Sequence, residues 1–215
     1  MIPKKIHYVW FGGKKKPELM ERCIYSWQKY LPGYEIFEWN EHNFDIAQNS
    51  YAQKAFQERK WAFVSDYARL KVLSDHGGIY LDSDVEVFKS FDIFLSHKAF
   101  SGFEYYRGVY SPITAVMGSI PHHIWIDELL EDYEEAEFTF ASMQTNTMRI
   151  TENLINRHNI INNNRQQIFS DDVHLYPAEV FCILSKSSYS YHHFGGSWLP
   201  LKSKFAKKVR KMFKT

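Results

Sequence analysis

The sequence of 215 residues predicts an α/β fold with a mainly parallel central sheet flanked by helices. Three observations support this prediction. Segments with strand character alternate with segments of helical periodicity through the first half of the chain. Gly-Gly or Pro-Gly pairs separate these segments at residues 12–13, 32–33 and 77–78. A short apolar strand over 79–81 ends in two aspartates, and open α/β sheets bind ligands at the ends of such strands.

The first elements follow in chain order. Lys5–Phe11 is a β-rich apolar segment that stops at a glycine pair, which predicts a buried strand and a tight turn. Apolar residues then recur at helical spacing from Leu19 to Trp27, which predicts a helix. Residues 34–39 alternate as a second strand, and 50–59 form a short helix.

The next helix leads directly to the two aspartates. Apolar residues recur at helical spacing over about 62–76, and Gly77-Gly78 supplies a left-handed stop. The strand 79–81 then runs through Asp82-Ser83-Asp84 into another strand at 85–88. The later elements are predicted as strands at 99–104 and 113–118 and helices at 122–135 and 147–158.

One domain is expected to span residues 1–201, because no linker or repeat divides them. Their charge balance of 19 basic to 25 acidic residues offers no basic face for nucleic acid. The apolar runs are too short to span a membrane. Cys23 and Cys182 flank no metal-ligand spacing and follow no secretory signal, so we expect buried, reduced thiols in a cytoplasmic protein.

The C-terminal tail, residues 202–215, differs from the rest of the chain. It holds seven Lys or Arg residues and no acid, with apolar residues between them. This pattern is typical of a short amphipathic helix that lies on an anionic membrane, here the inner leaflet of the cytoplasmic membrane. A solvated, frayed terminus is the alternative interpretation.

The pair Asp82 and Asp84 is the first candidate for chemistry. Two carboxylates separated by one residue in a turn can converge on one hard cation, such as Mn²⁺ or Mg²⁺. Such a cation can also bridge the oxygens of a substrate diphosphate and neutralise its charge as it leaves. A solvated acidic turn is the alternative.

The helix before this strand carries a second candidate group. Ser65, Asp66 and Arg69 lie on one face or on adjacent faces, because residues three and four apart are neighbours on a helix. The aspartate and arginine can offer an acceptor and a donor fork to sugar hydroxyls. They can equally form a structural ion pair at the rim of the helix.

The third candidate group is the segment His192–Trp198. A histidine ahead of a flexible Gly-Gly turn can bring a nitrogen ligand to a metal, and Ser197 and Trp198 can donate hydrogen bonds to phosphate. A histidine and a tryptophan with purely structural roles are the alternative.

Together these segments resemble the DXD-containing sugar transferases of glycosyltransferase family 32. That family includes bacterial capsular and other surface-polysaccharide transferases, and the glucosylating domains of clostridial toxins are similar at a distance. The resemblance runs from residue 2 to about residue 200. It rests on four motifs in the same order, at 2–13, 63–69, 77–85 and 192–198. The segment 111–115 is only loosely similar, so no acceptor contacts are carried over.

The resemblance implies a GT-A fold and a retaining transfer of a hexose or N-acetylhexosamine from a UDP-sugar. It implies Mn²⁺ or Mg²⁺ as cofactor and a surface polysaccharide or lipid-linked oligosaccharide as acceptor. The implied metal ligands are Asp82, Asp84 and His193, with His192 as the alternative. Trp10 would stack on uracil. The other implied substrate contacts are Ser65, Asp66, Arg69, Tyr80, Asp82, Ser83, Ser197 and Trp198. The implied catalytic set is Asp66, Arg69, Asp82 and Asp84.

Two other functions compete with this interpretation. A haloacid-dehalogenase-type phosphatase would use Asp82 as nucleophile and Asp171-Asp172 as its later acidic pair, but about 78 residues precede a motif that normally follows the first strand. A non-catalytic carbohydrate-binding protein would account for the 37 aromatic residues. An inverting transferase would need a carboxylate base, for which Asp171 and Asp172 are the candidates in the sequence, but an ordinary polar turn is the favoured interpretation of this pair.

Overall fold

The computed structural model of the chain describes residues 1–112, 115–139 and 146–195. Its centre is an eight-stranded sheet with the order β2-β1-β3-β7-β5-β9-β8, and β6 pairs with β5. The strands of this sheet are β1 (Lys5–Val9), β2 (Glu35–Trp39), β3 (Gly78–Leu81), β5 (Ala99–Tyr106), β6 (Val109–Pro112), β7 (Val116–Ser119), β8 (Gln167–Phe169) and β9 (Val173–Tyr176). A small second sheet joins β4 (Val85–Val87) to β10 (Ser190–His192).

The strand directions confirm the prediction of a mainly parallel sheet. Strand β1 is parallel to both β2 and β3, and β5 is parallel to β9. Strand β7 lies between β3 and β5 and is antiparallel to both, so β5 and β9 run in the same direction as β1. Strand β6 is antiparallel to β5, and β8 is antiparallel to β9. The C-terminal ends of β1, β3 and β5 therefore meet at one edge of the sheet.

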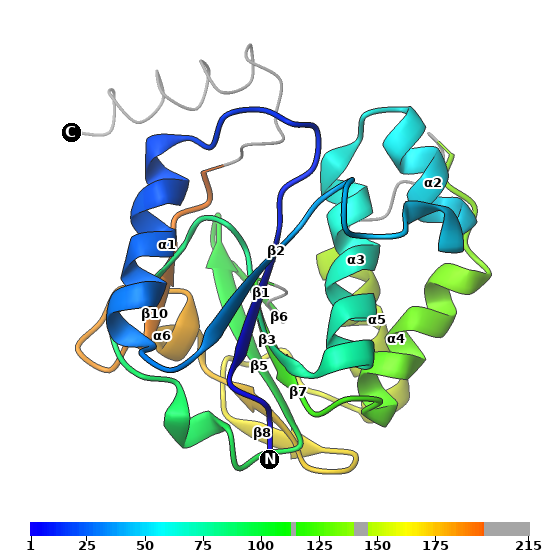
Figure 1. The fold of residues 1–215 in the computed structure, drawn as a ribbon. Helices are drawn as coiled ribbons and strands as arrows, with labels where there is room; N and C mark the ends of the chain where they lie inside the picture. Colours follow the sequence, from blue (N-terminus) through cyan, green and yellow to red (C-terminus); the bar gives the residue numbers. More distant parts are fainter. Residues whose placement is uncertain (113–114, 140–145, 196–215) are drawn as a thin grey trace.

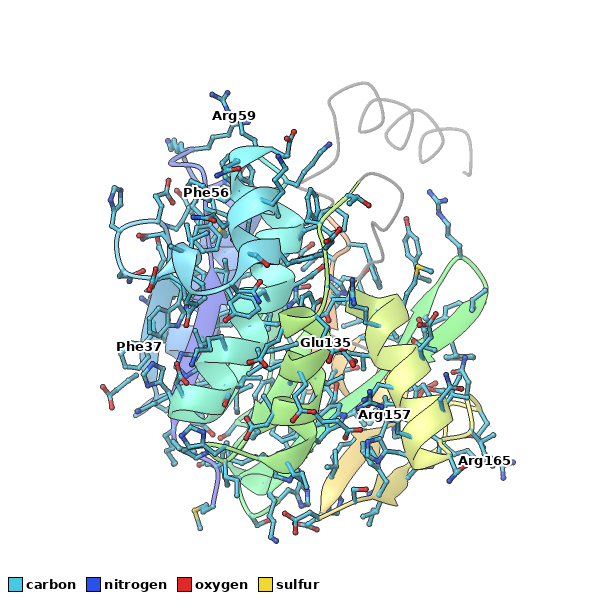
Figure 2. All side chains as sticks on the ribbon, turned by 90° about the vertical axis from the view of Figure 1, so that its right-hand side faces the viewer. Phe37, Phe56, Arg59, Glu135, Arg157 and Arg165 are labelled. Atoms are coloured by element: carbon cyan, nitrogen blue, oxygen red, sulfur yellow. The ribbon has the colours of Figure 1, made fainter. Side chains whose placement is uncertain are left out.

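Helices cover both faces of the sheet (Figure 1). Helices α1 (Glu18–Tyr30) and α6 (Ala178–Phe181) lie on one face. Helices α3 (Trp61–His76), α4 (Ile124–Glu134) and α5 (Asn146–His158) lie on the other face, towards the viewer of Figure 2. Helix α2 (Ser50–Gln57) packs against α3, and two 3₁₀ turns span Ile46–Gln48 and Asp92–Phe94. Because α3 contacts the sheet as well as α2 and α4, more than one side of it is buried.

The junction between α3 and β3 positions the two aspartates. Gly77 and Gly78 have φ of 59° and 102°, in the left-handed region predicted for this pair. A side chain at Gly78 would lie 2.8 Å from the Lys5 carbonyl oxygen, so the chain passes very close to β1 here. The His7 ring secures the same junction, since its Nε2 lies 2.8 Å from the Gly77 carbonyl oxygen. The chain can therefore reverse sharply and enter the sheet beside β1.

The later part of the chain departs more from the predicted elements. The predicted strand 113–118 overlaps β7 (Val116–Ser119), and residues 113–114 lie outside the described residues. The hairpin of β8 and β9, the short helix α6 and strand β10 carry no strong periodic signal, and the sequence analysis did not predict them. Cys23 and Cys182 are free and buried, as expected. None of the helices in the described ranges is long and apolar enough to cross a membrane.

Candidate active site

A cavity of about 650 Å³ opens at the C-terminal ends of β1, β3 and β5. Its lining includes the two aspartates after β3 and three polar residues of α3, which are Ser65, Asp66 and Arg69. Aromatic side chains form much of the remaining wall, and they are Trp10, Phe11, Trp61, Phe63, Tyr80, Tyr106 and Phe194. A concave, mostly apolar site with a few convergent polar groups is the usual form of a small-molecule site.

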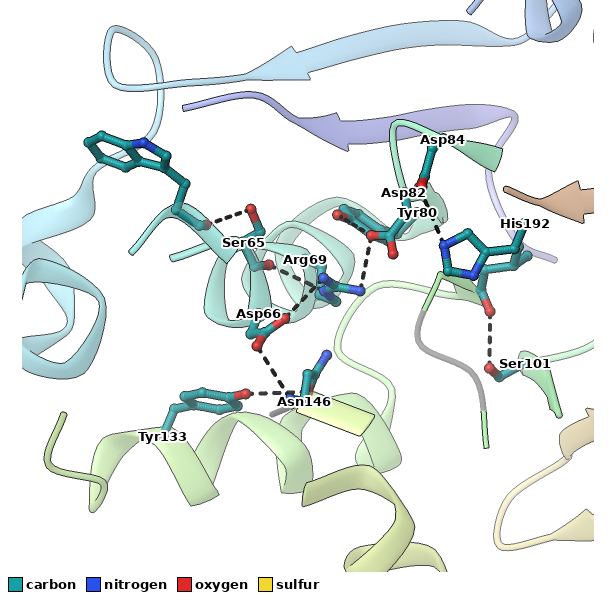
Figure 3. A network of polar contacts seen from close by, with 12 residues as sticks. Ser65, Asp66, Arg69, Tyr80, Asp82, Asp84, Ser101, Tyr133, Asn146 and His192 are labelled. Carbon is teal, nitrogen blue, oxygen red and sulfur yellow. Dashed lines mark hydrogen bonds and ion pairs between the residues drawn. The ribbon is translucent and has the colours of Figure 1, made fainter. Parts of the chain in front are cut away.

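Asp82 and Asp84 are held in different ways (Figure 3). The Asp82 Oδ1 atom accepts a hydrogen bond of 3.0 Å from the Tyr80 hydroxyl and lies 3.2 Å from Arg69 NH1. The Asp84 carboxylate accepts a 2.6 Å bond from the Gly195 N–H and lies 3.3 Å from His192 Nε2. Burial disfavours the Asp84 anion, but these partners outweigh it and hold its pKa below the ordinary value.

The structure places His192, the alternative of the two histidines, beside the aspartates. The sequence analysis preferred His193 as the metal ligand, but His193 Nε2 lies 2.7 Å from Glu86 Oε2 and points away from the aspartates. His192, its neighbour, faces Asp84 and is only 8% exposed. His192 is the last residue of β10, where it pairs with Val85, and His193 follows the end of the strand with its ring beside Glu86.

The donor atoms of Asp82, Asp84 and His192 fit a divalent cation. One atom from each residue lies within 4.8 Å of the others. Two carboxylates and an imidazole form a ligand set suited to Mn²⁺, and the carboxylates alone suit Mg²⁺. The His192 Nδ1 atom is buried and has no hydrogen-bond partner among the described residues. Burial opposes the cationic form of His192, yet Asp84, Asp82 and Glu104 together raise its pKa, which marks a strongly negative site.

A buried ion pair stands beside these ligands. Arg69 and Asp66 are 5% and 7% exposed, and Arg69 NH2 lies 3.0 Å from Asp66 Oδ1. The guanidinium also stacks 4.7 Å from the centre of the Tyr80 ring and bridges to Asp82. The pair is therefore buried at the cavity wall and does not lie at a solvated helix rim. Desolvation raises the pKa of Asp66 to about 6, although Arg69 opposes the shift.

Of the remaining predicted residues, some line the cavity and the others lie outside the described residues. Trp10 lines the cavity, and its Nε1 donates a 2.7 Å bond to the Lys14 carbonyl oxygen. Ser65 and Ser83 also line the cavity, and Ser65 Oγ donates back to the Trp61 carbonyl oxygen. Ser197 and Trp198 lie outside the described residues, as does the tail 202–215.

Several cavity residues escaped the sequence analysis. Trp61 also lines the cavity, and it packs against Gly12 so closely that a side chain at Gly12 would clash with it. Glu104 extends from β5, and its pKa is raised chiefly by burial. Asn146 begins α5 and is 2% exposed. An asparagine just ahead of a helical period was a usable signal for this last position, since it is typical of a helix start.

Asp171 and Asp172 do not belong to this site. They lie in the turn before β9, which runs parallel to β5 and in the direction of β3, so they lie at the opposite edge of the sheet from Asp82. Asp171 forms an ion pair with Lys98, and Asp172 accepts from the Lys98 N–H. Their proposed roles as phosphatase acids or as a transferase base are therefore wrong on position.

Residues 17–101 match the family model described as a glycosyltransferase sugar-binding region containing a DXD motif. Among curated proteins, the chain is 28% identical over 111 residues to Subversion of eukaryotic traffic protein A of Legionella pneumophila subsp. pneumophila, covering 39% of this chain and 17% of that protein. It is 27% identical over 139 residues to a glycosyltransferase of Acanthamoeba polyphaga mimivirus, covering 61% of this chain and 55% of that protein. The chain thus spans about a sixth and about half of these relatives.

Two solved structures share the fold. The PaToxG glycosyltransferase superposes with a TM-score of 0.55 at 20% identity, covering 73% of this chain and 70% of that one. A glycosyltransferase involved in glycosylation of the major capsid of PBCV-1 gives a TM-score of 0.51 at 13% identity, covering 97% and 98%. The predicted GT-A fold and the predicted resemblance to DXD glycosyltransferases are confirmed. The chain contains a DXD-type glycosyltransferase region on that fold.

Proposed function

We propose that this protein is a metal-dependent glycosyltransferase that takes a hexose or N-acetylhexosamine from a UDP-sugar. The observation that carries the proposal is one cavity in which three potential metal ligands adjoin a buried aspartate–arginine pair. Diphosphate binding and sugar binding need these two kinds of group side by side. The DXD region and the fold support the same conclusion.

The donor would lie along the cavity from its aromatic end to the ion pair. Trp10 and Trp61 line the end suited to a nucleobase, since flat apolar rings stack on bases. Asp66 and Arg69 line the end suited to the sugar, where the carboxylate can accept from hydroxyls and the guanidinium can donate to them. Tyr80 and Ser83 also line the cavity.

Asp82, Asp84 and His192 would hold Mn²⁺ or Mg²⁺, which supplies charge neutralisation to a departing diphosphate. The chain's own groups do the positioning. Arg69 lies between Asp66 and Asp82, so one guanidinium fixes a sugar-binding carboxylate relative to a metal-binding one. Such fixed charges stabilise a transition state without reorganising during the reaction.

We also propose that the transfer retains the anomeric configuration, as the family resemblance implies. A front-face reaction lets the departing phosphate oxygen take the acceptor proton, so no protein base is required. An inverting reaction needs a carboxylate base. Among the described residues of the cavity, Glu104 is the carboxylate left for that task after Asp66, Asp82 and Asp84 are assigned. The anomeric configuration of the product, measured by NMR, distinguishes the two.

The acceptor and the location are proposals from sequence only. A surface polysaccharide or lipid-linked oligosaccharide at the cytoplasmic membrane would make a basic C-terminal anchor useful. The test is to delete residues 202–215 and measure binding to vesicles that contain anionic lipid. Unchanged binding would remove the anchor from the proposal.

The main experiment is a panel of UDP-sugars incubated with the full chain and Mn²⁺, with UDP release as the measurement. Turnover of at least one sugar that stops on chelation is the expected result. Calorimetry with UDP is run in parallel with and without Mn²⁺. Metal-dependent UDP binding without turnover of any sugar would favour a non-catalytic protein, and the absence of UDP binding would overturn the proposal.

A further inference from the structure

A second group of potential metal ligands lies at the opposite edge of the sheet from the candidate active site. It consists of His97, Asp172 and His174, and one donor atom from each lies within 4.8 Å of the others. His97 lies two residues before β5, and Asp172 immediately precedes β9. Because β5 and β9 are parallel neighbours that pair Ala99 with Val173, their first residues lie side by side. The sheet therefore brings together three side chains from distant parts of the sequence.

The two imidazole rings of this group lie unusually close to one another. The ring centres of His97 and His174 are 3.6 Å apart, with an angle of 18° between the ring planes. Aromatic pairs prefer offset or edge-to-face arrangements with centres about 4.5–7 Å apart. His97 Nε2 also lies 2.7 Å from the Tyr176 hydroxyl, which helps to hold that ring in place. A cation bound by both rings would account for so close an approach.

Asp172 supplies an anionic oxygen beside the two rings. Its Oδ1 lies 2.9 Å from His174 Nε2, and its Oδ2 accepts a 3.1 Å bond from the Lys98 N–H. The side chain of His174 is 12% exposed and that of Asp172 is 44% exposed, so the carboxylate remains accessible to an ion from solvent. His174 Nδ1 is buried and, within the described ranges, has no hydrogen-bond partner. Such buried atoms are uncommon, which indicates that the protein alone does not complete this group.

We propose that His97, Asp172 and His174 bind a Zn²⁺ ion. Zinc takes histidine nitrogen and carboxylate oxygen in a tetrahedral arrangement, and a site with three protein ligands keeps its fourth position for water. Two imidazoles and one carboxylate favour zinc over Mn²⁺ and Mg²⁺, which prefer oxygen ligands. The candidate active site has the opposite ratio, with two carboxylates and one imidazole.

The zinc ion has a structural role at this position. It ties the segment before β5 to the turn before β9, and so stabilises the edge of the sheet that lies away from the cavity. The zinc site is therefore independent of the proposed glycosyl transfer, and zinc binding can be measured whether or not a sugar is turned over.

The chain provides a matched control in His158. Its Nε2 lies 3.0 Å from Glu128, so it also pairs with a carboxylate, and its side chain is 8% exposed. In the part of the chain that the structure describes, His158 belongs to no group of three potential metal ligands. His158→Ala therefore removes a histidine–carboxylate pair without removing a ligand of the proposed zinc site.

The experiment is a calorimetric titration of the chelator-treated full chain with Zn²⁺. All proteins carry His192→Ala, which removes the imidazole of the other ligand group, and excess Mg²⁺ competes for the remaining carboxylates. His97→Ala should weaken zinc binding at least about 100-fold, and Asp172→Asn at least about tenfold. His158→Ala should leave zinc binding unchanged. At a zinc concentration about 100 times the Kd, the Tm should rise by about 5–10 °C, and His97→Ala should lose this rise.

The outcomes that would overturn the zinc site are distinct. Zinc binding that is equally strong with and without His97→Ala and Asp172→Asn would exclude these residues as ligands. An equal loss in His158→Ala would mark unspecific binding to histidines and would overturn the proposal as well. Circular dichroism establishes that each variant is folded. If His97→Ala does not fold, Asp172→Asn decides the question alone, because its side chain is partly exposed and the substitution conserves its shape.

Discussion

Replacing the adjacent residues His192 and His193, one at a time, by alanine tests the metal site most directly. His192 Nε2 lies 3.3 Å from Asp84, and His192 supplies one of the three donors that converge there. Without it, Asp84 keeps only the Gly195 N–H of these two partners. His193 instead pairs with Glu86, where the two side chains are 18% and 23% exposed. The two substitutions therefore remove the same ring from adjacent positions that contact different carboxylates.

The expected magnitudes differ widely. Loss of a metal donor should lower turnover at least about 100-fold, which corresponds to about 2.7 kcal/mol of transition-state stabilisation. Loss of the His193–Glu86 pair should cost about 0.2–1 kcal/mol of stability, as for other partly exposed pairs, and should change turnover less than about fivefold.

The assay is UDP release over a titration of Mn²⁺, with thermal unfolding to establish that both variants are folded. The His192→Ala curve should shift to much higher Mn²⁺ concentration, and the His193→Ala curve should overlie the wild type. Near-normal turnover in His192→Ala beside a large loss in His193→Ala would refute the assignment of His192 as the metal ligand.

Three further predictions follow from individual contacts. Asp84→Ala should lower turnover by about two orders of magnitude or more while the circular dichroism spectrum stays native, and normal turnover would exclude this carboxylate as a ligand. Burial lowers the pKa of His7 to about 4, so the unfolded state binds more protons between pH 6.5 and 4, and stability is lost as pH falls through that window. Between pH 7 and pH 4 the wild type should therefore lose about 3 kcal/mol more than His7→Gln in urea unfolding, and parallel pH profiles would contradict the neutral buried ring. Glu104→Gln should change kcat less than about tenfold if the reaction is retaining, whereas a loss of 100-fold or more together with inverted product would make Glu104 the base.

Much of the first half of the fold was predictable because its signals are local. Helical periodicity over 62–76 and the glycine pair after it predicted α3 and the reversal into β3. The ends of the strands flanking Asp82 and Asp84 then followed from the apolar residues around them. The hairpin of β8 and β9 and the short β10 were missed, since strands of three or four residues are stabilised by their partners more than by their own sequence.

The choice between His192 and His193 could not be predicted from neighbouring residues in the sequence. Both histidines precede the same glycine pair, and only the pairing of β10 with β4 decides which one faces Asp84. A shift of one residue in that register would exchange their faces. Asn146 is a similar case, because only the tertiary structure brings its backbone N–H to the carboxylate of Asp66, 80 residues earlier in the chain.

The sequence by itself determined the order of the elements, the DXD turn and the four motifs that carry the family resemblance. These depend on residues that lie within a few positions of one another, where periodicity and turn chemistry act. The tertiary structure decided which histidine joins the aspartates, that the Asp66–Arg69 pair is buried, and that Asp171 and Asp172 lie at the far edge of the sheet. Those outcomes depend on strand register and on packing between distant segments, which fix where a side chain points only once the whole sheet has formed.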